Sequence, residues 1–344
     1  MDAVAPARRA AAIALARTPA NDPWAYAQAV AASSPTAPNP TCGLDEEPEF
    51  GDAHMEEGAF VAHVTKPAGP DYAAAMHRID QALRLSPDPF DRAVADAIRA
   101  DRVLVPAPRL DALVQDAVSS SDPRVYALAY GLCSHASAAG TGCQQLSARQ
   151  WANLDPGNAV PWLFLFNQAA SAGDLSGEQE AMAHMAASAR FDQRSYAVAG
   201  AIAEKLPDDD ATLAAKFDLI QQSISLSASG WVPYSSLVVA CRDKAGGDVN
   251  RVQQCEAVSD LLFDHADSLL SRSVGGALFK QATGDSSHLD AAHAELRAIS
   301  AHSPPAASDS PCNGMRDMMK RMLRNASLGE VEAARERMRT LESR

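Results

Sequence analysis

Six cysteines are the residues whose type and spacing carry the clearest chemistry in this sequence. Cys133 and Cys143 flank the segment SHASAAGTG, and Cys241 and Cys255 flank RDKAGGDVNRVQQ. In both segments, glycine and small polar residues interrupt a helical pattern, which indicates two antiparallel helices with a thiol near each facing end. Thiols placed in this way can approach as closely as a disulfide requires. We therefore expect the disulfides Cys133–Cys143 and Cys241–Cys255.

Cys42 and Cys312 lie in turn-like surroundings, PNPTCGLD and DSPCNGM. By elimination they could join the N-terminal region to the C-terminal region. The alternative for all six cysteines is that they are buried free thiols, which behave as small apolar side chains. A zinc site is disfavoured because no C-x-x-C spacing occurs.

Paired cysteines predict an oxidising compartment, which means the bacterial periplasm, the cell surface or the exterior. Each short disulfide loop would stabilise the fold by about 2–4 kcal/mol. Arg8 and Arg9 precede a short apolar stretch, but Arg17 follows at once, so this stretch is typical of an alanine-rich helix rather than a signal peptide. We therefore expect a periplasmic or secreted protein whose signal peptide is not present in this chain.

Other chemical signatures are missing from the sequence. There is no G-x-S-x-G, H-E-x-x-H or phosphate-loop motif. We interpret His54 and Glu57 as a pair on the protein surface. We interpret Asp208–Asp210 as residues that cap the start of a helix. The prediction is a protein without catalytic residues, metal ligands or cofactor. The alternative is an envelope enzyme with a helical shell that acts on cell-wall glycan, which would require Glu178 or Glu204 to face a deep cleft.

The charge balance points to the kind of partner. The chain has 43 acidic and 30 basic residues, a formal net charge of −13, which opposes nucleic-acid binding and favours a basic protein or peptide. No apolar run is long enough to span a membrane. Near the C-terminus, four methionines from Met315 to Met322 share one helical stripe. We expect this stripe to cover the end of the core, and a methionine-rich groove for a partner is the alternative.

Helix-period segments separated by Pro, Gly and Asp run nearly end to end, and strand patterns are missing. The expected helices are 7–17, 22–32, 50–64, 71–85, 89–101, 108–119, 123–138, 143–154, 159–172, 177–190, 194–205, 208–226, 232–244, 249–264, 267–282, 287–301, 313–325 and 328–342.

The exits of successive helix pairs recur at a regular spacing. ALRLSP ends at Pro87, VSSSDP at Pro123, WANLDP at Pro156, and ARFDQ at Gln193. The steps between these positions are 36, 33 and 37 residues. A period in this range predicts a helix–turn–helix repeat.

Two segments resemble the tetratricopeptide repeat. DYAAAMHRIDQALRLSP (71–87) is similar to the second helix of that repeat, with small residues at Ala75 and Ala82. LDPGNAVPWLFLFNQAASAGDL (154–175) is similar to a repeat exit followed by a first helix, and the likeness continues to 192. Phe166 departs from the pattern, which has a small residue there. The resemblance to the tetratricopeptide and Sel1-like superfamily implies an all-α, right-handed α-solenoid of stacked helical hairpins, braced by disulfides. The alternative is an irregular alanine-rich helical bundle.

The expected organisation has three parts: 1–48 with N-terminal helices and an irregular Pro-rich segment, 49–301 with the helical repeats, and 302–344 with a linker and a capping helix hairpin. The resemblance implies a concave surface that binds another protein or an extended peptide. We expect an inhibitor or immunity-type protein, or a scaffold for envelope assembly. The aromatic residues considered as either core anchors or partner-binding side chains are Tyr126, Tyr130, Trp162, Phe166, Tyr196, Trp231 and Tyr234.

Overall fold

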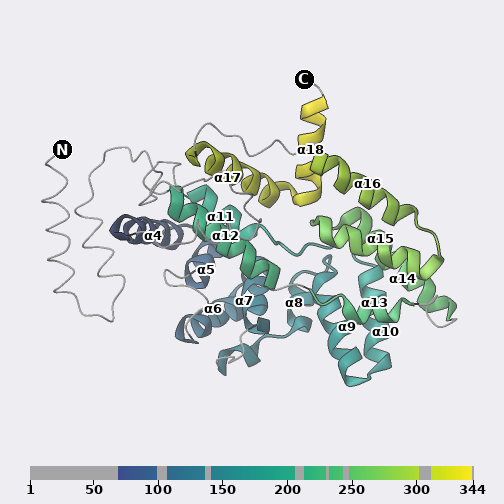
Figure 1. Cartoon of the computed structure of the whole chain (residues 1–344). Coiled ribbons are helices and arrows are strands. Elements are labelled where there is room, and N and C mark those ends of the chain that lie inside the picture. The colour runs from purple at the N-terminus through teal and green to yellow at the C-terminus, as the bar shows by residue number, and fades with distance from the viewer. Residues whose placement is uncertain are drawn as a thin grey trace, which may run out of the picture. The chain divides into compact units, whose positions relative to one another are not determined.

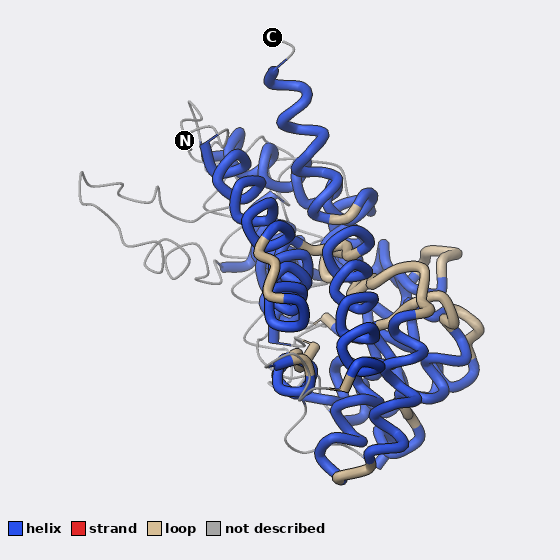
Figure 2. The backbone as a smooth tube through the Cα atoms, turned by 90° about the vertical axis from the view of Figure 1, so that its right-hand side faces the viewer, coloured by secondary structure: helices blue, strands red, loops and turns tan. Residues whose placement is uncertain are grey.

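The fold is all-α, as the sequence predicts. A computed structural model describes residues 69–98, 107–135, 141–205, 213–229, 232–242, 248–301 and 311–342 (Figure 1). Over these ranges the chain forms fifteen α-helices and one 3-10 helix, η1. No strand occurs within them, and the β-pairing there consists of two isolated bridges (Figure 2). The predicted helices before residue 69, with the boundary at 48–49, lie outside the described residues.

The chain divides into two compact units, each built from several stretches of the sequence. The described helices of the first unit are α4 (Gly69–Arg84), α5 (Pro89–Ala97), α11 (Ala197–Lys205), most of α12 (Leu213–Ser229) and most of α17 (Pro311–Leu328). In the core of this unit, Ile79, Val94 and Ile202 are fully or almost fully buried. The buried carboxylate of Asp91 ties α5 to α11, because it lies 2.8 Å from the Lys205 ammonium.

The second unit contains the remaining described helices, many of which pack in sequential pairs such as α6–α7, α9–α10 and α14–α15. Its helices are α6 (Ala107–Ser119), α7 (Pro123–His135), η1 (Thr141–Gln145), α8 (Ala148–Leu154), α9 (Val160–Ala172), α10 (Leu175–Ala186), α13 (Ser235–Ala240), α14 (Val249–His265), α15 (Leu269–Thr283), α16 (Ser287–Ala301) and α18 (Glu330–Glu342).

Short polar side chains and glycines set the ends of these helices. Asp174 caps α10 and Asp248 caps α14, because each carboxylate accepts a hydrogen bond from a main-chain N–H of the first turn. Gly173 ends α9 in the left-handed region, with φ of 69°. The helix predicted for 143–154 is broken into η1 and α8, because Ser147 caps α8 by accepting from the Gln150 N–H.

Two adjacent glycines allow α15 to pack closely against both of its neighbours. A Cβ atom on Gly275 would lie 2.7 Å from the Phe263 nitrogen and 2.8 Å from the Ser259 oxygen of α14. A Cβ atom on Gly276 would lie 2.8 Å from the Leu289 main chain of α16. The absence of side chains at these positions therefore lets three helices meet backbone to backbone.

Two disulfides brace the second unit at the pairs that the sequence predicts. The α-carbons are 5.6 Å apart for Cys133–Cys143 and 5.7 Å apart for Cys241–Cys255. Cys312, on α17 of the first unit, is buried and is also disulfide-bonded. Cys42 lies outside the described residues.

On α17, Met315 and Met319 are buried. None of the described helices combines the length and the apolar character needed to cross a bilayer.

Candidate functional site

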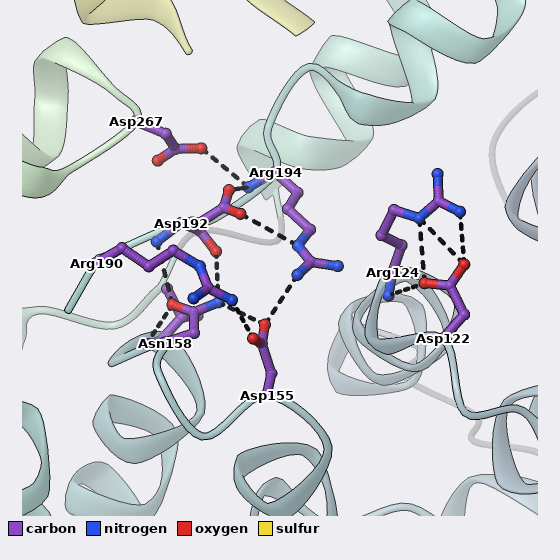
Figure 3. A network of polar contacts seen from close by, with 9 residues as sticks. Asp122, Arg124, Asp155, Asn158, Arg190, Asp192, Arg194 and Asp267 are labelled. Carbon is purple, nitrogen blue, oxygen red and sulfur yellow. Dashed lines mark hydrogen bonds and ion pairs between the residues drawn. The ribbon is translucent and has the colours of Figure 1, made fainter. Parts of the chain in front are cut away.

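Three turns of the second unit lie side by side and form a polar junction (Figure 3). Residues 155–159 join α8 to α9, residues 187–196 follow α10, and residues 266–268 join α14 to α15. The polar side chains of these turns, which we call the junction, are Asp155, Asn158, Arg190, Asp192, Arg194 and Asp267.

Main-chain hydrogen bonds hold the three turns together. The Ala159 N–H donates to the Arg190 oxygen at 3.0 Å. The Phe191 N–H donates to the His265 oxygen at 3.0 Å, and the Asp267 N–H donates to the Phe191 oxygen at 3.1 Å. The central turn is therefore bonded on both sides, in two isolated parallel bridges.

Asn158 links the first two turns through its side chain and is completely buried. Its amide Nδ2 donates to Asp155 Oδ2 at 3.1 Å and to the Asp192 oxygen at 2.9 Å. Its Oδ1 accepts from the N–H groups of Val160 and Asp192, both at 3.1 Å. Both donors and the acceptor of this amide are occupied, so its role is structural.

Asp155 carries a buried negative charge that two arginines neutralise (Figure 3). Arg194 Nη2 lies 2.9 Å from Asp155 Oδ2, and Arg190 Nη2 pairs with Asp155 Oδ1. The Arg194 side chain is mostly buried, whereas that of Arg190 remains 43% exposed. A buried carboxylate requires such partners, because an unpaired charge in this place would be strongly destabilising.

The backbone at Arg194 adopts a conformation that a residue with a Cβ rarely takes. Its φ is 56°, and it is the sole non-glycine residue with positive φ among those that the structure describes. The left-handed region costs about 1 kcal/mol for such a residue. The polar contacts of Arg194 offset this cost, because its main-chain N–H donates to both Asp192 Oδ1 and Asp267 Oδ2 at 3.0 Å.

Asp192 and Asp267 therefore bring two carboxyl groups to one N–H donor. Burial, followed by the charge of the neighbouring Asp192, raises the pKa of Asp267 to about 7. Asp267 Oδ1 is buried and has no hydrogen-bond partner. Two carboxyl groups in this arrangement favour a state that holds one proton.

Tyr196 and Glu330 dock α18 beside the junction. The Tyr196 hydroxyl donates to the Glu330 carboxylate at 3.0 Å, and the Leu269 N–H donates to the same carboxylate at 2.9 Å. The Glu330 N–H in turn donates to the Asp267 oxygen at 2.7 Å. Burial, followed by the charge of Glu330, raises the pKa of Tyr196.

Tyr234 belongs to a second polar group nearby. Its hydroxyl lies 2.8 Å from Ser271 Oγ, and Gln193 Nε2 donates to both of these oxygens. Burial is the main cause that raises the pKa of Tyr234. Tyr196 and Tyr234, both considered for partner binding, thus use their hydroxyl groups to connect helices of the second unit.

The structure places four other aromatic candidates in the core. Tyr126, Tyr130, Trp162 and Phe166 are each at most 8% exposed, so other parts of the protein cover almost all of these residues. Trp231 lies outside the described residues.

A shallow surface depression of about 470 Å³ lies along α9. It is lined by Phe164, Asn167, Gln168, Ser171 and Ala172, none of which carries an ionisable group. The depression therefore cannot supply the carboxyl pair that glycan hydrolysis uses.

The two carboxylates considered for an enzyme are placed elsewhere. Glu178 on α10 is mostly buried and lies 3.5 Å from the Arg251 guanidinium on α14. Glu204 is exposed on α11. No three metal-binding side chains gather among the residues that the structure describes.

Two exposed apolar side chains occupy neighbouring helix ends in the second unit. Leu175 is the first residue of α10 and Val249 the first of α14, and each is 68% exposed. The Glu178–Arg251 ion pair, within the first turn of both helices, brings these ends together. We call Leu175 and Val249 the apolar tip.

The fold and the junction together define an all-helical protein whose helices pack in sequential pairs. No protein-family model, no curated protein and no solved structure matches this chain.

The sequence pattern predicts that helix pairs end at Pro156 and Gln193, but it does not predict that the polar residues of the junction lie together. One feature of the sequence could have indicated it. Asp155 and Asp192 are 37 residues apart, and each is the next-to-last residue of its segment, WANLDP and ARFDQ. Asp267 lies 75 residues beyond Asp192, about two such steps.

Proposed function

We propose that this chain is a non-enzymatic, exported protein of tetratricopeptide-like helical repeats that binds another protein. The observation that carries the proposal is the apolar tip. Leu175 and Val249 keep most of their surface in water at two adjoining helix ends. Burying such side chains against a partner would stabilise the complex by about 25 cal/mol per Å² of apolar area.

The surroundings of the apolar tip favour a basic partner. Asp174 and Asp248, the capping residues that precede Leu175 and Val249, are both exposed. The whole chain carries a formal net charge of −13. A partner that presents apolar side chains among lysines or arginines would complement both the apolar tip and the negative electrostatic potential around it.

The second unit would present this surface with little loss of conformational freedom. The Cys241–Cys255 disulfide ties the end of α13 to α14, and Arg251 ties α14 to α10. A surface that is already ordered loses less entropy on binding. The disulfides also fit an oxidising compartment. These features favour an inhibitor or immunity-type protein over a scaffold for envelope assembly.

Affinity capture from the native envelope, followed by mass spectrometry, tests the proposal. The wild-type chain is compared with the double variant Leu175→Ser, Val249→Ser and with the control Leu85→Ser, which changes a side chain 83% exposed in the first unit. We expect one stoichiometric basic protein with the wild type and with the control, and at least a tenfold lower recovery with the double variant. Equal recovery with all three proteins would refute the role of the tip.

A further inference from the structure

The carboxyl pair also connects parts of the second unit that are far apart in sequence. Asp192 lies in the segment after α10, and Asp267 lies in the turn between α14 and α15. Their oxygens share one donor, the N–H of Arg194, at 3.0 Å each. The Asp267 main-chain oxygen accepts from the Glu330 N–H, at the start of α18.

The donors present are too few for two carboxylates. Beyond the shared N–H, Asp267 accepts from the Gln193 main-chain N–H, and Asp192 Oδ2 receives a long contact of 3.4 Å from Arg194 Nε. Asp267 Oδ1 is buried without a partner. The Arg194 guanidinium is directed to Asp155, which it contacts through Nη2 at 2.9 Å. One proton between the carboxyl groups supplies the missing donor and removes the repulsion of two adjacent charges.

The Arg194 guanidinium forms an ion pair with Asp192 at 3.4 Å but is shared with Asp155, and Glu330 adds a further negative charge beside the pair. The Glu330 carboxylate accepts from Tyr196 and from the Leu269 N–H. Burial first, and the charge of Asp267 among the smaller causes, raises the pKa of the Tyr196 and Tyr234 hydroxyls. The groups that face Asp267 from the packed segments are Asp192, Arg194, Tyr196, Tyr234 and Glu330.

We propose that Asp192 and Asp267 form a pH-sensitive latch, which holds the α14–α15 turn against the segment after α10 while the pair retains one proton. When this proton is lost to solvent, the two carboxylates repel each other across the Arg194 N–H that they share. The latch then loosens, and with it the attachment of the α18 N-terminus to the Asp267 oxygen. This device belongs to the chain itself and does not depend on the proposed partner.

The direction of the pH dependence follows from linkage. The folded protein holds the proton of Asp267 up to about pH 7, whereas the unfolded chain loses it near pH 4. Stability from this group is therefore fully present at low pH and is lost as the pH rises through 7. Asp267→Asn keeps the shape of the neutral carboxyl group and cannot lose the proton.

Urea unfolding of the full chain between pH 5 and pH 8 tests the latch. The measured quantity is the unfolding equilibrium constant of the wild type divided by that of Asp267→Asn. We expect this ratio to increase by a factor of about 10 to 100 from pH 5 to pH 8. Both proteins carry the same nine histidines, so their titration cancels in the ratio. Asp116→Asn, at an exposed position of α6, is the matched control and should keep the wild-type slope. A ratio that stays constant from pH 5 to pH 8 would overturn the latch.

Two measurements on the unmodified protein keep the test decisive if Asp267→Asn does not fold. A ¹³C-carboxyl titration should give an apparent midpoint for the pair near pH 7, and a midpoint below pH 5 for both carboxyl groups would overturn the proposal. Amide hydrogen exchange of Glu330 and Arg194, corrected for intrinsic rates, should accelerate above pH 7 more than exchange in α9. Equal changes in both regions would count against a local latch.

Discussion

Replacing Gly275 by alanine should destabilise the second unit, although alanine is the better helix former. The new Cβ atom would lie 2.7 Å from the Phe263 nitrogen and 2.8 Å from the Ser259 oxygen, both main-chain atoms that cannot rotate away. Overpacking of this kind costs about 1–3 kcal/mol or more. The gain in helix propensity is about 1 kcal/mol at most. We therefore expect a net loss of up to about 2 kcal/mol, the difference between these two effects.

Gly131 offers a matched control in the same unit. It lies within α7, and a Cβ atom there would meet nothing within 4 Å. Gly131→Ala should therefore stabilise the protein by about 0.5–1 kcal/mol. Urea unfolding followed by circular dichroism and by tryptophan fluorescence measures both variants. A Gly275→Ala protein that is as stable as Gly131→Ala would show that α14 and α15 do not meet backbone to backbone.

Three further predictions concern the junction and the disulfides. Asp155→Asn leaves Arg190 and Arg194 without their shared carboxylate. Because Arg190 is partly exposed, we expect the free energy of unfolding in urea to fall by about 2–3 kcal/mol, which is less than the full cost of breaking a buried pair. An unchanged unfolding midpoint would contradict this prediction. Arg194→Gly should be about 1 kcal/mol more stable than Arg194→Ala, since both lose the side chain but only glycine relieves the left-handed backbone, and equal stabilities would argue against this strain. Mutating Cys241 and Cys255 to serine should lower the free energy of unfolding by about 3 kcal/mol, as expected for a closed loop with a sequence separation of 14. A loss below about 1 kcal/mol would mean that this disulfide does not stabilise the fold.

Much of the local structure could be predicted because it depends on neighbouring residues. The helix at 287–301 agrees with α16 at both ends, and the helix at 108–119 differs from α6 by one residue. Caps, prolines and glycines act within a few residues of themselves, so a sequence pattern records them directly. The two disulfides of the second unit were predictable for the same reason, because each joins the ends of adjacent helical segments.

The junction could not be assembled from the sequence because its members come from turns far apart in the chain. Asp155, Asp192 and Asp267 each look like an ordinary turn residue, and only the packing of α9–α10 beside α14–α15 brings them together. The break at Ser147 shows a similar limit, because one capping hydrogen bond outweighed a continuous helical pattern. Burial of Trp162 and Phe166 likewise depends on how helices pack, which composition alone does not determine.

Site-specific photo-crosslinking in the native envelope tests the proposed protein-binding role most directly. A photoreactive amino acid is placed at Leu175, at Val249 or, as a control, at Leu85, all of which are highly exposed. The protein-binding proposal predicts one basic protein attached at Leu175 and at Val249, and no such adduct at Leu85. No adduct at either tip position, or the same adduct at all three positions, would contradict it.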